Sequence, residues 1–383
     1  MNGQRPIVGI VGAGQLARMC WQAGIGLDVD VRLLAARPDD AAAQVVPDPR
    51  IGDPDDPAAL AALARECDVL TLDHELVDIA TLDKLEAAGH VIHPRGTTLR
   101  YAQDKAYQRA RFSAAGLPVP AHTCVAHEQD VAEFAEQHGW PLVLKLPRGG
   151  YDGRGVWHVD GPEALSRIWS DVASGAADQV LVEEAVAIAC EVAVLLARRP
   201  SGQVAVAPLI ETVQHDGMLR ELIVPARVPA PTQDAAVDLA RRVSDLVDVV
   251  GVCAIELFWT GAELLINEIA TRPHNSGHWT IDGATTSQFE NHLRAVLDWP
   301  LGAMDAIRPA VCSVNVVGRD ETSWPQAYLA TALEIPDVHV HLYGKQPRAG
   351  RKVGHVTATG DTVEAARARA HRAADVLTGR HES

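Results

Sequence analysis

The sequence has no long apolar run and no clustered cysteines, and each absence argues against a class of protein. No stretch approaches the roughly 18 consecutive apolar residues of a transmembrane helix, and the N-terminus has no apolar segment like that of a signal peptide. The six cysteines lie far apart and form no C-x-x-C pair, which is typical of a reducing compartment. We therefore expect a cytoplasmic protein that does not contact a membrane.

An excess of basic residues is also lacking. The 383 residues carry a formal net charge of −16, whereas binding to nucleic acid needs a basic surface, so we expect no nucleic-acid partner. Hydrophobic residues make up 47% of the chain and charged residues 22%, which is typical of a globular protein with a sizeable core. A chain of this length has room for two or three domains.

The N-terminal quarter alternates short apolar strands with helices. The pattern predicts strands at residues 6–12, 30–36 and 68–72. It predicts helices between and after them, at residues 15–24, 56–67 and 78–88. Short buried strands separated by helices of this length indicate an α/β unit with a parallel sheet, as in a Rossmann-like fold. We expect such a domain over residues 1–100.

The remainder of the chain has a mixed α+β pattern. Strands come in pairs joined by glycine-containing turns, at 142–146 with 155–159 and at 252–259 with 264–270. Helices are predicted between and beside these pairs, at 128–138, 162–173 and 233–249. Because a linker with two prolines precedes residue 310, we expect a larger domain over 101–305 and a small C-terminal domain over 306–383.

Residues 8–19, VGIVGAGQLARM, have a glycine pattern close to that of a dinucleotide-binding turn. A site for NAD also needs an acidic residue about 20 positions later, at the end of the second strand, to hold the ribose. Ala35 and Ala36 occupy that place, and Arg37 would at most serve NADP. We therefore predict that Gly12 and Gly14 form a tight turn that does not bind NAD(P) and that lines a substrate pocket at the carboxyl end of the sheet.

A second glycine-rich segment is more specific. Four of the seven residues from Gly149 to Gly155 are glycine, and apolar strands flank them. Such a loop lets backbone N–H groups approach phosphate oxygens, although it lacks the Lys-Ser/Thr pair of a Walker A loop. Lys145 precedes it, and Arg100 and Lys105 add two cations. We predict a loop that closes over the phosphates of a nucleotide; the alternative is an ordinary glycine-rich hairpin.

Two glutamates are predicted to face each other across a hairpin. If the hairpin is symmetric about residue 262, Glu256 lies opposite Glu268, and directly opposed Cβ atoms are about 4.5–5.5 Å apart. Two such carboxylates among apolar neighbours repel each other unless a divalent cation lies between them. Mg²⁺ uses few protein oxygens when phosphates complete its shell. The alternative is an exposed pair on a solvated edge.

Polar and basic residues are concentrated in two later segments. Arg272, His274, Asn275, Ser276 and His278 follow the hairpin directly. The histidines have H-x-x-x-H spacing, but the proline and glycine among them make a helical zinc motif improbable, so we expect a loop that binds anions. The second segment holds Lys345, Arg348, Arg351 and Lys352, and it is either a phosphate site or a solvated basic turn.

These motifs resemble those of the 5-(carboxyamino)imidazole ribonucleotide synthetases, which are ATP-grasp ligases of purine biosynthesis. The resemblance rests on GAGQLARM, GGYDGRG, NEIATRPHNSGHWT and QPRAGRKVGH, in the expected order. It implies an ATP-grasp fold with a preATP-grasp domain over residues 1–100 and a lid over about 120–185. It also implies that ATP, bicarbonate and 5-aminoimidazole ribonucleotide react through carboxyphosphate, with Mg²⁺ or Mn²⁺, in a homodimer.

The resemblance further implies which residues form the site. Three residues are expected to be catalytic, namely Arg272, His274 and Asn275. Glu256 and Glu268 would hold the metal ion. The nucleotide would be held by Arg100, Lys105, Lys145, Gly150, Tyr151, Asp152, Gly153, Arg154, Gly155, Val156, Glu183, Glu184, Ala185, Val186, Glu191, Gln214, Asn267 and Glu268. The ribonucleotide would be held by Gln15, Tyr151, Asp152, Arg154, Lys345, Arg351 and Lys352.

Two positions depart from the family pattern. In ETVQHDG, Thr212 and Gln214 stand where the family often has an asparagine and a histidine, and His215 comes one step later. Val156 stands where a glutamine is common. The first departure puts one nucleotide contact in question, whereas the second removes a side-chain role but leaves the backbone of the glycine loop intact.

Three other functions compete with this interpretation. A formate-dependent glycinamide ribonucleotide transformylase is another ATP-grasp ligase, and the segment RPHNSGHW argues against it. An NAD(P) oxidoreductase would need the missing acidic residue after the second strand. A nucleotide-binding regulator without activity would be expected to lack Glu256 or Glu268, and both are present.

Overall fold

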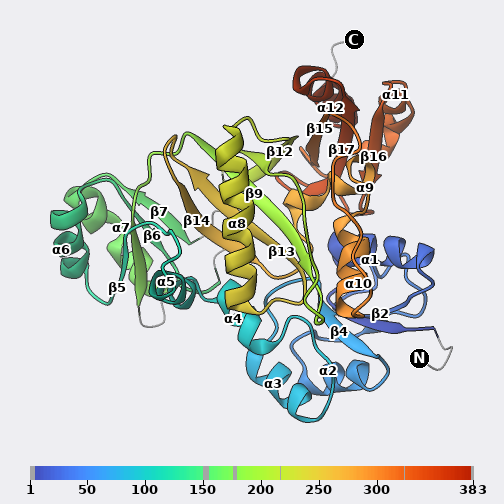
Figure 1. The fold of residues 1–383 in the computed structure, drawn as a ribbon, viewed down its shortest axis with the longest axis horizontal. Coiled ribbons are helices and arrows are strands. Elements are labelled where there is room, and N and C mark those ends of the chain that lie inside the picture. Colours follow the sequence, from blue (N-terminus) through green and yellow to red (C-terminus); the bar gives the residue numbers. More distant parts are fainter. Residues whose placement is uncertain (1–4, 150–154, 176–178, 216, 323, 381–383) are drawn as a thin grey trace.

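The computed structural model describes residues 5–149, 155–175, 179–215, 217–322 and 324–380, which form three β-sheets with helices around them (Figure 1). The N-terminal sheet has four strands in the order β3-β2-β1-β4, and all of its pairings are parallel. Its strands are β1 (Ile7–Val11), β2 (Asp30–Ala35), β3 (Arg50–Ile51) and β4 (Val69–Leu72). Its helices are α1 (Gln15–Gly26), α2 (Pro57–Ala64) and α3 (Ile79–Ala87). The predicted parallel α/β unit is confirmed.

A second four-stranded sheet forms a separate lobe, drawn in green in Figure 1. Its order is β5-β8-β6-β7, with β5 (His122–Val125), β6 (Leu142–Lys145), β7 (Val156–Val159) and β8 (Val180–Glu184). Helices α6 (Glu128–His138) and α7 (Pro162–Gly175) pack on it around Val131 and Val172. The predicted hairpin of residues 142–146 with 155–159 is confirmed as β6 and β7, in which Lys145 lies opposite Val156.

The central sheet has nine strands among the described residues, in the order β14-β13-β9-β11-β12-β15-β17-β16, with β10 also paired to β9. Six of them come from the middle of the chain: β9 (Cys190–Arg198), β10 (Val204–Val206), β11 (Ile210–His215), β12 (Met218–Val224), β13 (Gly251–Trp259) and β14 (Leu264–Ala270). Helix α8 (Ala230–Val247) packs on this sheet. It begins three residues before the predicted start at 233 because proline is compatible with the first turn of a helix.

The C-terminal part of the chain continues this central sheet. Strands β15 (Ala310–Val317), β16 (Val338–Leu342) and β17 (Lys352–Gly360) extend it, since β15 pairs antiparallel with β12. Helices α9 (Thr280–Gly283) and α10 (Gln288–Val296) precede these strands, and α11 (Leu329–Leu333) and α12 (Val363–Leu377) cover them. The predicted division of the chain into domains at residues 100 and 305 stays a prediction.

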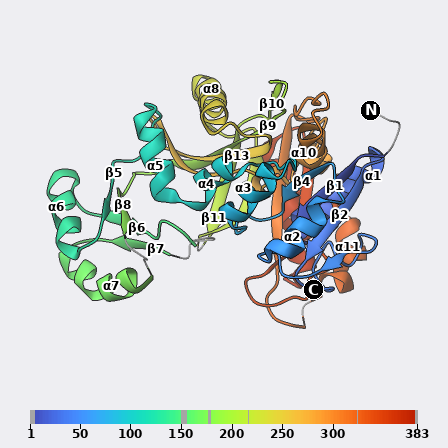
Figure 2. The same ribbon diagram turned by 90° about the horizontal axis from the view of Figure 1, so that it is seen from below.

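Two helices join the N-terminal sheet to the rest, α4 (Gly96–Gln103) and α5 (Lys105–Ala114). Asp104 separates them, and its carboxylate caps α5 by accepting a hydrogen bond of 2.9 Å from the Tyr107 backbone N–H. In Figure 2, α5 lies between the green lobe and the central sheet. The N-terminus of α5 therefore lies where the two sheets approach each other.

Among the described residues, no helix combines the length and the apolar character that crossing a membrane would require. The longest of the helices named above, α8, buries one face against the central sheet and carries charged residues such as Asp234 and Arg241 elsewhere.

Candidate active site

A cavity of about 600 Å³ lies between the lobe of residues 122–184 and the central sheet. This volume is in the range of small-molecule sites. Many of the residues predicted from the sequence line it together: Lys105, Lys145, Val156, Glu183, Ala185, Val186, Glu191, Gln214, Glu256, Asn267, Glu268, His274, Asn275 and Lys352. They come from segments almost 250 residues apart in the chain, so the fold and not local sequence brings them together.

Each wall of the cavity has an apolar part and a charged part, and both parts come from the same strand. Side chains two residues apart on a strand point to the same face. Val143 and Lys145 on β6 therefore share one wall, and Glu256 and Phe258 on β13 share the other. Each wall changes from apolar to charged along its strand. Such a cavity fits a ligand that has a flat apolar part and a charged part.

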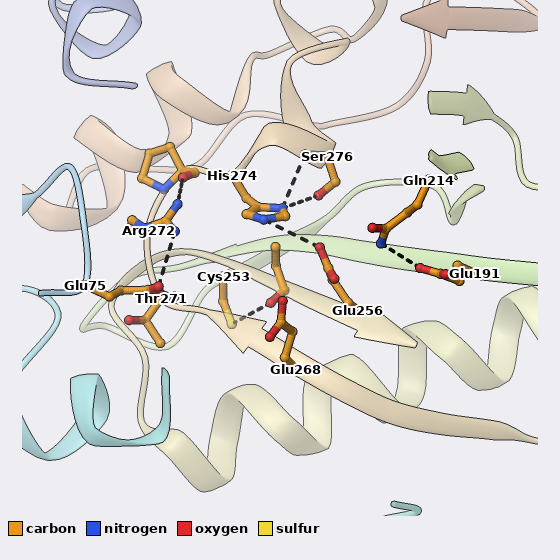
Figure 3. A network of polar contacts seen from close by, with 12 residues as sticks. Glu75, Glu191, Gln214, Cys253, Glu256, Glu268, Thr271, Arg272, His274 and Ser276 are labelled. Carbon is orange, nitrogen blue, oxygen red and sulfur yellow. Dashed lines mark hydrogen bonds and ion pairs between the residues drawn. The ribbon is translucent and has the colours of Figure 1, made fainter. Parts of the chain in front are cut away.

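Glu256 and Glu268 face each other across β13 and β14, as predicted. Figure 3 shows the two side chains on neighbouring strands, and both residues line the cavity. The register shifts immediately beyond this pair, because Leu257 pairs with Ile266 and Asn267 is left as the extra residue of a β-bulge. The symmetric hairpin of the prediction holds at the glutamates but not toward the turn. Lys105 donates to Glu268 Oε2 at 3.0 Å.

The two carboxylates have different electrostatic surroundings. Burial and then the charge of Glu268 raise the pKa of Glu256 above its usual value. Burial also acts on Glu268, but the Lys105 ammonium outweighs it and the pKa of Glu268 is lowered. The Glu256 side chain is 18% exposed and that of Glu268 is 43% exposed. A cation stabilises two partly buried carboxylates that repel each other in this way, so the pair fits a hard divalent ion with oxygen ligands.

A buried ion cluster holds Lys145 beside these carboxylates. Its ammonium lies 2.6 Å from Glu183 Oε2 and 3.3 Å from Asn267 Oδ1. Glu183 also accepts a hydrogen bond from Arg109, which was not predicted as a site residue. Burial raises the pKa of Glu183, but the two cations outweigh it and bring this pKa to about 2. Glu183, predicted to hold the nucleotide, directs its carboxylate to these cations.

Glu191 and Gln214 lie beside each other at the cavity, on β9 and β11. Gln214 Nε2 donates to Glu191 Oε2 at 2.7 Å, as Figure 3 shows. Burial raises the pKa of Glu191. The pairing of β11 with β12 is irregular between Val213 and Gln214. Gln214 therefore occupies the site in spite of its departure from the family pattern.

The loop after β14 places His274 next to the glutamate pair. Its Nε2 lies 3.5 Å from Glu256 Oε1, and its Nδ1 lies 2.9 Å from Ser276 Oγ. Burial, followed by the charge of Arg272, lowers the pKa of His274 to about 3, so the ring is neutral. In the described part of the chain, no group of three or more His, Cys, Asp and Glu side chains is arranged to hold a metal ion.

Arg272 points toward the N-terminal sheet. Its guanidinium lies 3.2 Å from Glu75 Oε2, while Glu75 Oε1 accepts a hydrogen bond of 2.9 Å from the Thr271 backbone (Figure 3). Glu75 follows β4 in the chain. This ion pair fixes the start of the loop that carries His274 against the N-terminal sheet.

A second polar region lies at the carboxyl end of the parallel sheet. Gln15, the first residue of α1, accepts a hydrogen bond from Lys345, although 330 positions separate them. Burial, followed by the charges of Arg351 and Lys352, lowers the pKa of Lys345 to about 8 against the opposing effect of Asp73. The structure thus brings Gln15 to the C-terminal basic segment, as predicted for one substrate pocket.

The comparisons with known proteins cover the whole of this architecture. Residues 6–103 match the ribonucleotide synthetase preATP-grasp domain, 110–289 the ATP-grasp domain, and 312–369 the phosphoribosylaminoimidazole carboxylase C-terminal domain. The N5-carboxyaminoimidazole ribonucleotide synthase of Mycobacterium tuberculosis is 46% identical over 97% of this chain and 88% of its own length. That of Corynebacterium ammoniagenes is 41% identical over 97% and 92%.

This chain belongs to the N5-carboxyaminoimidazole ribonucleotide synthase family. Solved structures of that family have the same fold. An ADP complex matches with a TM-score of 0.90, at 31% identity over 99% of both chains. The Aspergillus clavatus synthase in complex with ADP and 5-aminoimidazole ribonucleotide matches with a TM-score of 0.88, at 30% identity over 97% of this chain and 98% of that one. The predicted ATP-grasp fold and the prediction of an ATP-dependent carbon–nitrogen ligase are confirmed.

Some residues assigned from the resemblance to this synthase family lie elsewhere. Arg100 is exposed, and its guanidinium stacks over Tyr107, 4.2 Å from the ring centroid. Glu184 accepts a hydrogen bond of 2.9 Å from the Ala121 backbone. Gly155 has a φ of +71° and joins the strands of the lid hairpin. The predictions for Gly150, Tyr151, Asp152, Gly153 and Arg154 concern residues outside the described ranges.

The cavity of this synthase-family member also has walls that the sequence analysis missed. They are mostly apolar, namely Val143, His158, Ile188, Gly217, Leu219 and Phe258. The spacing of His158, Ile188, Gly217 and Leu219 does not distinguish them from residues of the hydrophobic core. Only the alternation along β6 and β13, two positions from Lys145 and Glu256, could have indicated Val143 and Phe258.

We expect this synthase-family member not to bind NADH. The Asp73 carboxylate accepts hydrogen bonds from the backbone N–H groups of Gly14 at 2.5 Å and Ala17 at 2.9 Å. It therefore occupies the amides at the start of α1 that a Rossmann site offers to a pyrophosphate. Calorimetric titration with NADH should give no heat of binding, with ATP titrated as the positive control. Micromolar binding of NADH would contradict the prediction.

Proposed function

We propose that this chain carboxylates 5-aminoimidazole ribonucleotide with bicarbonate at the expense of ATP, giving 5-(carboxyamino)imidazole ribonucleotide, ADP and phosphate. One observation carries the proposal beyond family membership. Lys352 from the C-terminal basic segment lines the same cavity as Lys145 and Glu268. The charged end of the cavity is thus next to the region of Gln15 and Lys345. A nucleotide and a phosphorylated acceptor can therefore lie side by side.

The nucleotide is held with its base against the apolar walls and its phosphates against the cations. Val143 and Phe258 flank the base, and backbone groups of Ala185 and Val186 read its edge. Glu191, which Gln214 orients, holds the ribose hydroxyls. Lys105 and Lys145 neutralise the phosphates, together with the glycine loop that precedes β7. Phosphoryl transfer depends mainly on such positioning and charge neutralisation.

Glu256 and Glu268 would hold Mg²⁺, or Mn²⁺ in its place. When bound, the ion neutralises charge on the phosphates during transfer. The repulsion between the two carboxylates and the oxygen-only ligands fit such an ion, as argued from the pKa of Glu256. Asn267 at the bulge adds an amide oxygen to the same wall.

Bicarbonate reacts in three steps. Its oxygen attacks the γ-phosphorus while the bond from that phosphorus to ADP breaks, which gives carboxyphosphate. Loss of phosphate then yields CO₂, and the exocyclic amine of the ribonucleotide captures it and loses a proton. Because carboxyphosphate hydrolyses readily, the site has to exclude water. Arg272, neutral His274 and Asn275 bind bicarbonate and the transferred phosphoryl group.

The C-terminal basic segment binds the 5′-phosphate of the ribonucleotide. Lys345, Arg351 and Lys352 supply positive charge in a chain whose net charge is −16. Gln15 orients Lys345 from the start of α1. Homodimer formation and a cytoplasmic location remain predictions of the sequence.

We expect the affinity for the ribonucleotide to fall as the pH rises above 8. The pKa of Lys345 is lowered to about 8, so its ammonium is charged below this pH and loses its proton above it. At pH 9 about one tenth of a group with this pKa is charged, and kcat/KM for the ribonucleotide should fall about tenfold between pH 7 and pH 9. Steady-state kinetics at saturating ATP measures this.

The matched control for this pH effect is Lys345→Arg, since a guanidinium stays charged throughout the range. This variant should show a flat profile from pH 7 to pH 9. An unchanged kcat/KM for the wild type over the same range would contradict the assignment of Lys345.

Release of ADP tests the proposed reaction directly. ADP formation from MgATP should depend on both bicarbonate and 5-aminoimidazole ribonucleotide, and one carboxylated product should appear for each ADP. Glycinamide ribonucleotide with formate serves as the control for the competing transformylase. Turnover with that pair, or none with aminoimidazole ribonucleotide, would refute the proposal.

A further inference from the structure

Arg109 is a fully buried arginine beside the cavity. Its exposure is 1%, and it lies on α5 one helical turn after Lys105. Three acceptors surround it: the Glu183 carboxylate, Gln108 Oε1 at 2.9 Å and the Asn267 backbone oxygen at 2.5 Å. An arginine is rarely buried so deeply unless its charge is matched, so the partners of this one require an explanation.

The acceptors of Arg109 belong to both walls of the cavity. Glu183 lies on β8 of the lobe, where its other oxygen contacts Lys145 at 2.6 Å. Asn267 is the extra residue of the bulge next to Glu268, and its side chain accepts from Lys145 at 3.3 Å. One guanidinium therefore contacts each residue that holds the Lys145 ammonium.

The charges of this cluster do not cancel. Arg109 and Lys145 contribute two positive charges and Glu183 one negative charge, and the side chains of Arg109 and Glu183 are each 2% exposed. If Lys145 alone faced Glu183, the pair would be neutral, and the carboxylate would compete with a phosphate for the ammonium. Burial and the positive charge of Arg109 both lower the pKa of Lys145, whereas Glu183 raises it.

We propose that Arg109 is a positioning residue for phosphoryl transfer. It shares the Glu183 carboxylate with Lys145, so that the positive charge of Lys145 stays available to the triphosphate. At the same time it fixes the bulge at Asn267, and thereby the direction of Glu268. The inference rests on the proposed function, because it concerns a step of that reaction. Arg109 itself does not line the cavity, and on this view it does not touch the substrate.

A double-mutant cycle separates this role from packing. We expect Arg109→Met to lower kcat about 10²-fold, the loss that follows when a reacting group is misplaced by about 1 Å. The KM for MgATP should change less, because the contacts to base and ribose remain. Adding Glu183→Gln to Arg109→Met restores the net positive charge around Lys145, and the double variant should be at least tenfold faster than Arg109→Met alone.

A packing role predicts a different result. If Arg109 only packed, Glu183→Gln would remove a second buried hydrogen-bonding group, and the double variant would have a lower kcat than Arg109→Met. A double variant no faster than Arg109→Met would overturn the proposal, as would Arg109→Met with kcat within threefold of the wild type. Arg111→Met, on the exposed face of the same helix, is the matched control and should leave kcat unchanged.

Arg109→Lys keeps the proposal testable if Arg109→Met does not fold, as thermal melting will show. It retains the positive charge, so kcat should stay within about tenfold of the wild type, and a loss of 10²-fold or more would refute the charge argument. An assay of the wild type in parallel distinguishes a failure of the proposed function from a failure of the role proposed for Arg109. ADP release that does not depend on aminoimidazole ribonucleotide would refute the proposed function, whereas the ratios among variants test Arg109.

Discussion

Glu268→Gln should abolish turnover and leave the fold intact. The substitution removes one of two opposed carboxylates and with it a charged oxygen for the metal ion. Loss of one preorganised electrostatic group of this kind typically costs about 10²–10³-fold in kcat. Loss of a metal ligand should reach or exceed the upper end of that range. ADP release at saturating Mg²⁺ measures the effect, and near wild-type activity there would contradict the assignment.

The stability of this variant tests the same site without an activity assay. The substitution relieves repulsion within the pair, and it loses an ion pair to Lys105 in which the Glu268 side chain is 43% exposed. Exposed ion pairs contribute only about 0–1 kcal/mol, so the melting temperature without metal should not fall. Mg²⁺ with ADP should raise the melting temperature of the wild type and not that of the variant. Glu263→Gln, at the exposed turn of the same hairpin, should behave as the wild type.

Lys145→Met should have the second largest effect, about 10²–10³-fold in kcat. Its side chain is 8% exposed, and its ammonium lies between Glu183 and Asn267, where it would face the phosphates. Removal leaves Arg109 paired with Glu183, so the buried charges balance and the protein should fold. The KM for MgATP should rise less than kcat falls, because the charge is needed most during transfer.

Steady-state kinetics and thermal melting of this variant are best compared with Lys84→Met. Lys84 is an exposed residue of α3, and its removal should change neither kcat nor the melting temperature. If Lys145→Met retained more than about one tenth of the wild-type kcat, Lys145 would not be the main phosphate ligand.

The parts of the site that the sequence predicted are those set by local periodicity. The opposition of Glu256 and Glu268 followed from the alternation of a strand and the position of the turn. The same reasoning placed Lys145 at the end of β6 next to the glycine loop. Both inferences need only short-range geometry, in which side chains alternate and paired strands are in register.

The parts that the sequence could not predict depend on distant contacts. The bulge at Asn267 has no signature in NEIATRP, because its register is set by how β14 pairs with β13 along the whole hairpin. From the sequence alone, Arg109 would be assigned to the exposed face of a polar helix. Only the fold brings Glu183 and Asn267 into contact with it. The same holds for Asp73, which follows β4 but caps the backbone amides of α1.

The continuity of the central sheet ties the two halves of the molecule into one cooperative unit. The strand β12 pairs with β11 on one side and with β15 on the other, where Ile223 lies opposite Cys312. Without the C-terminal strands, β12 would be an edge with unpaired N–H and C=O groups and the apolar Leu222 and Val224 beside them. Such an edge favours aggregation. We therefore expect a chain shortened before β15 to be less soluble than the whole chain, because β12 would then be an unprotected edge strand.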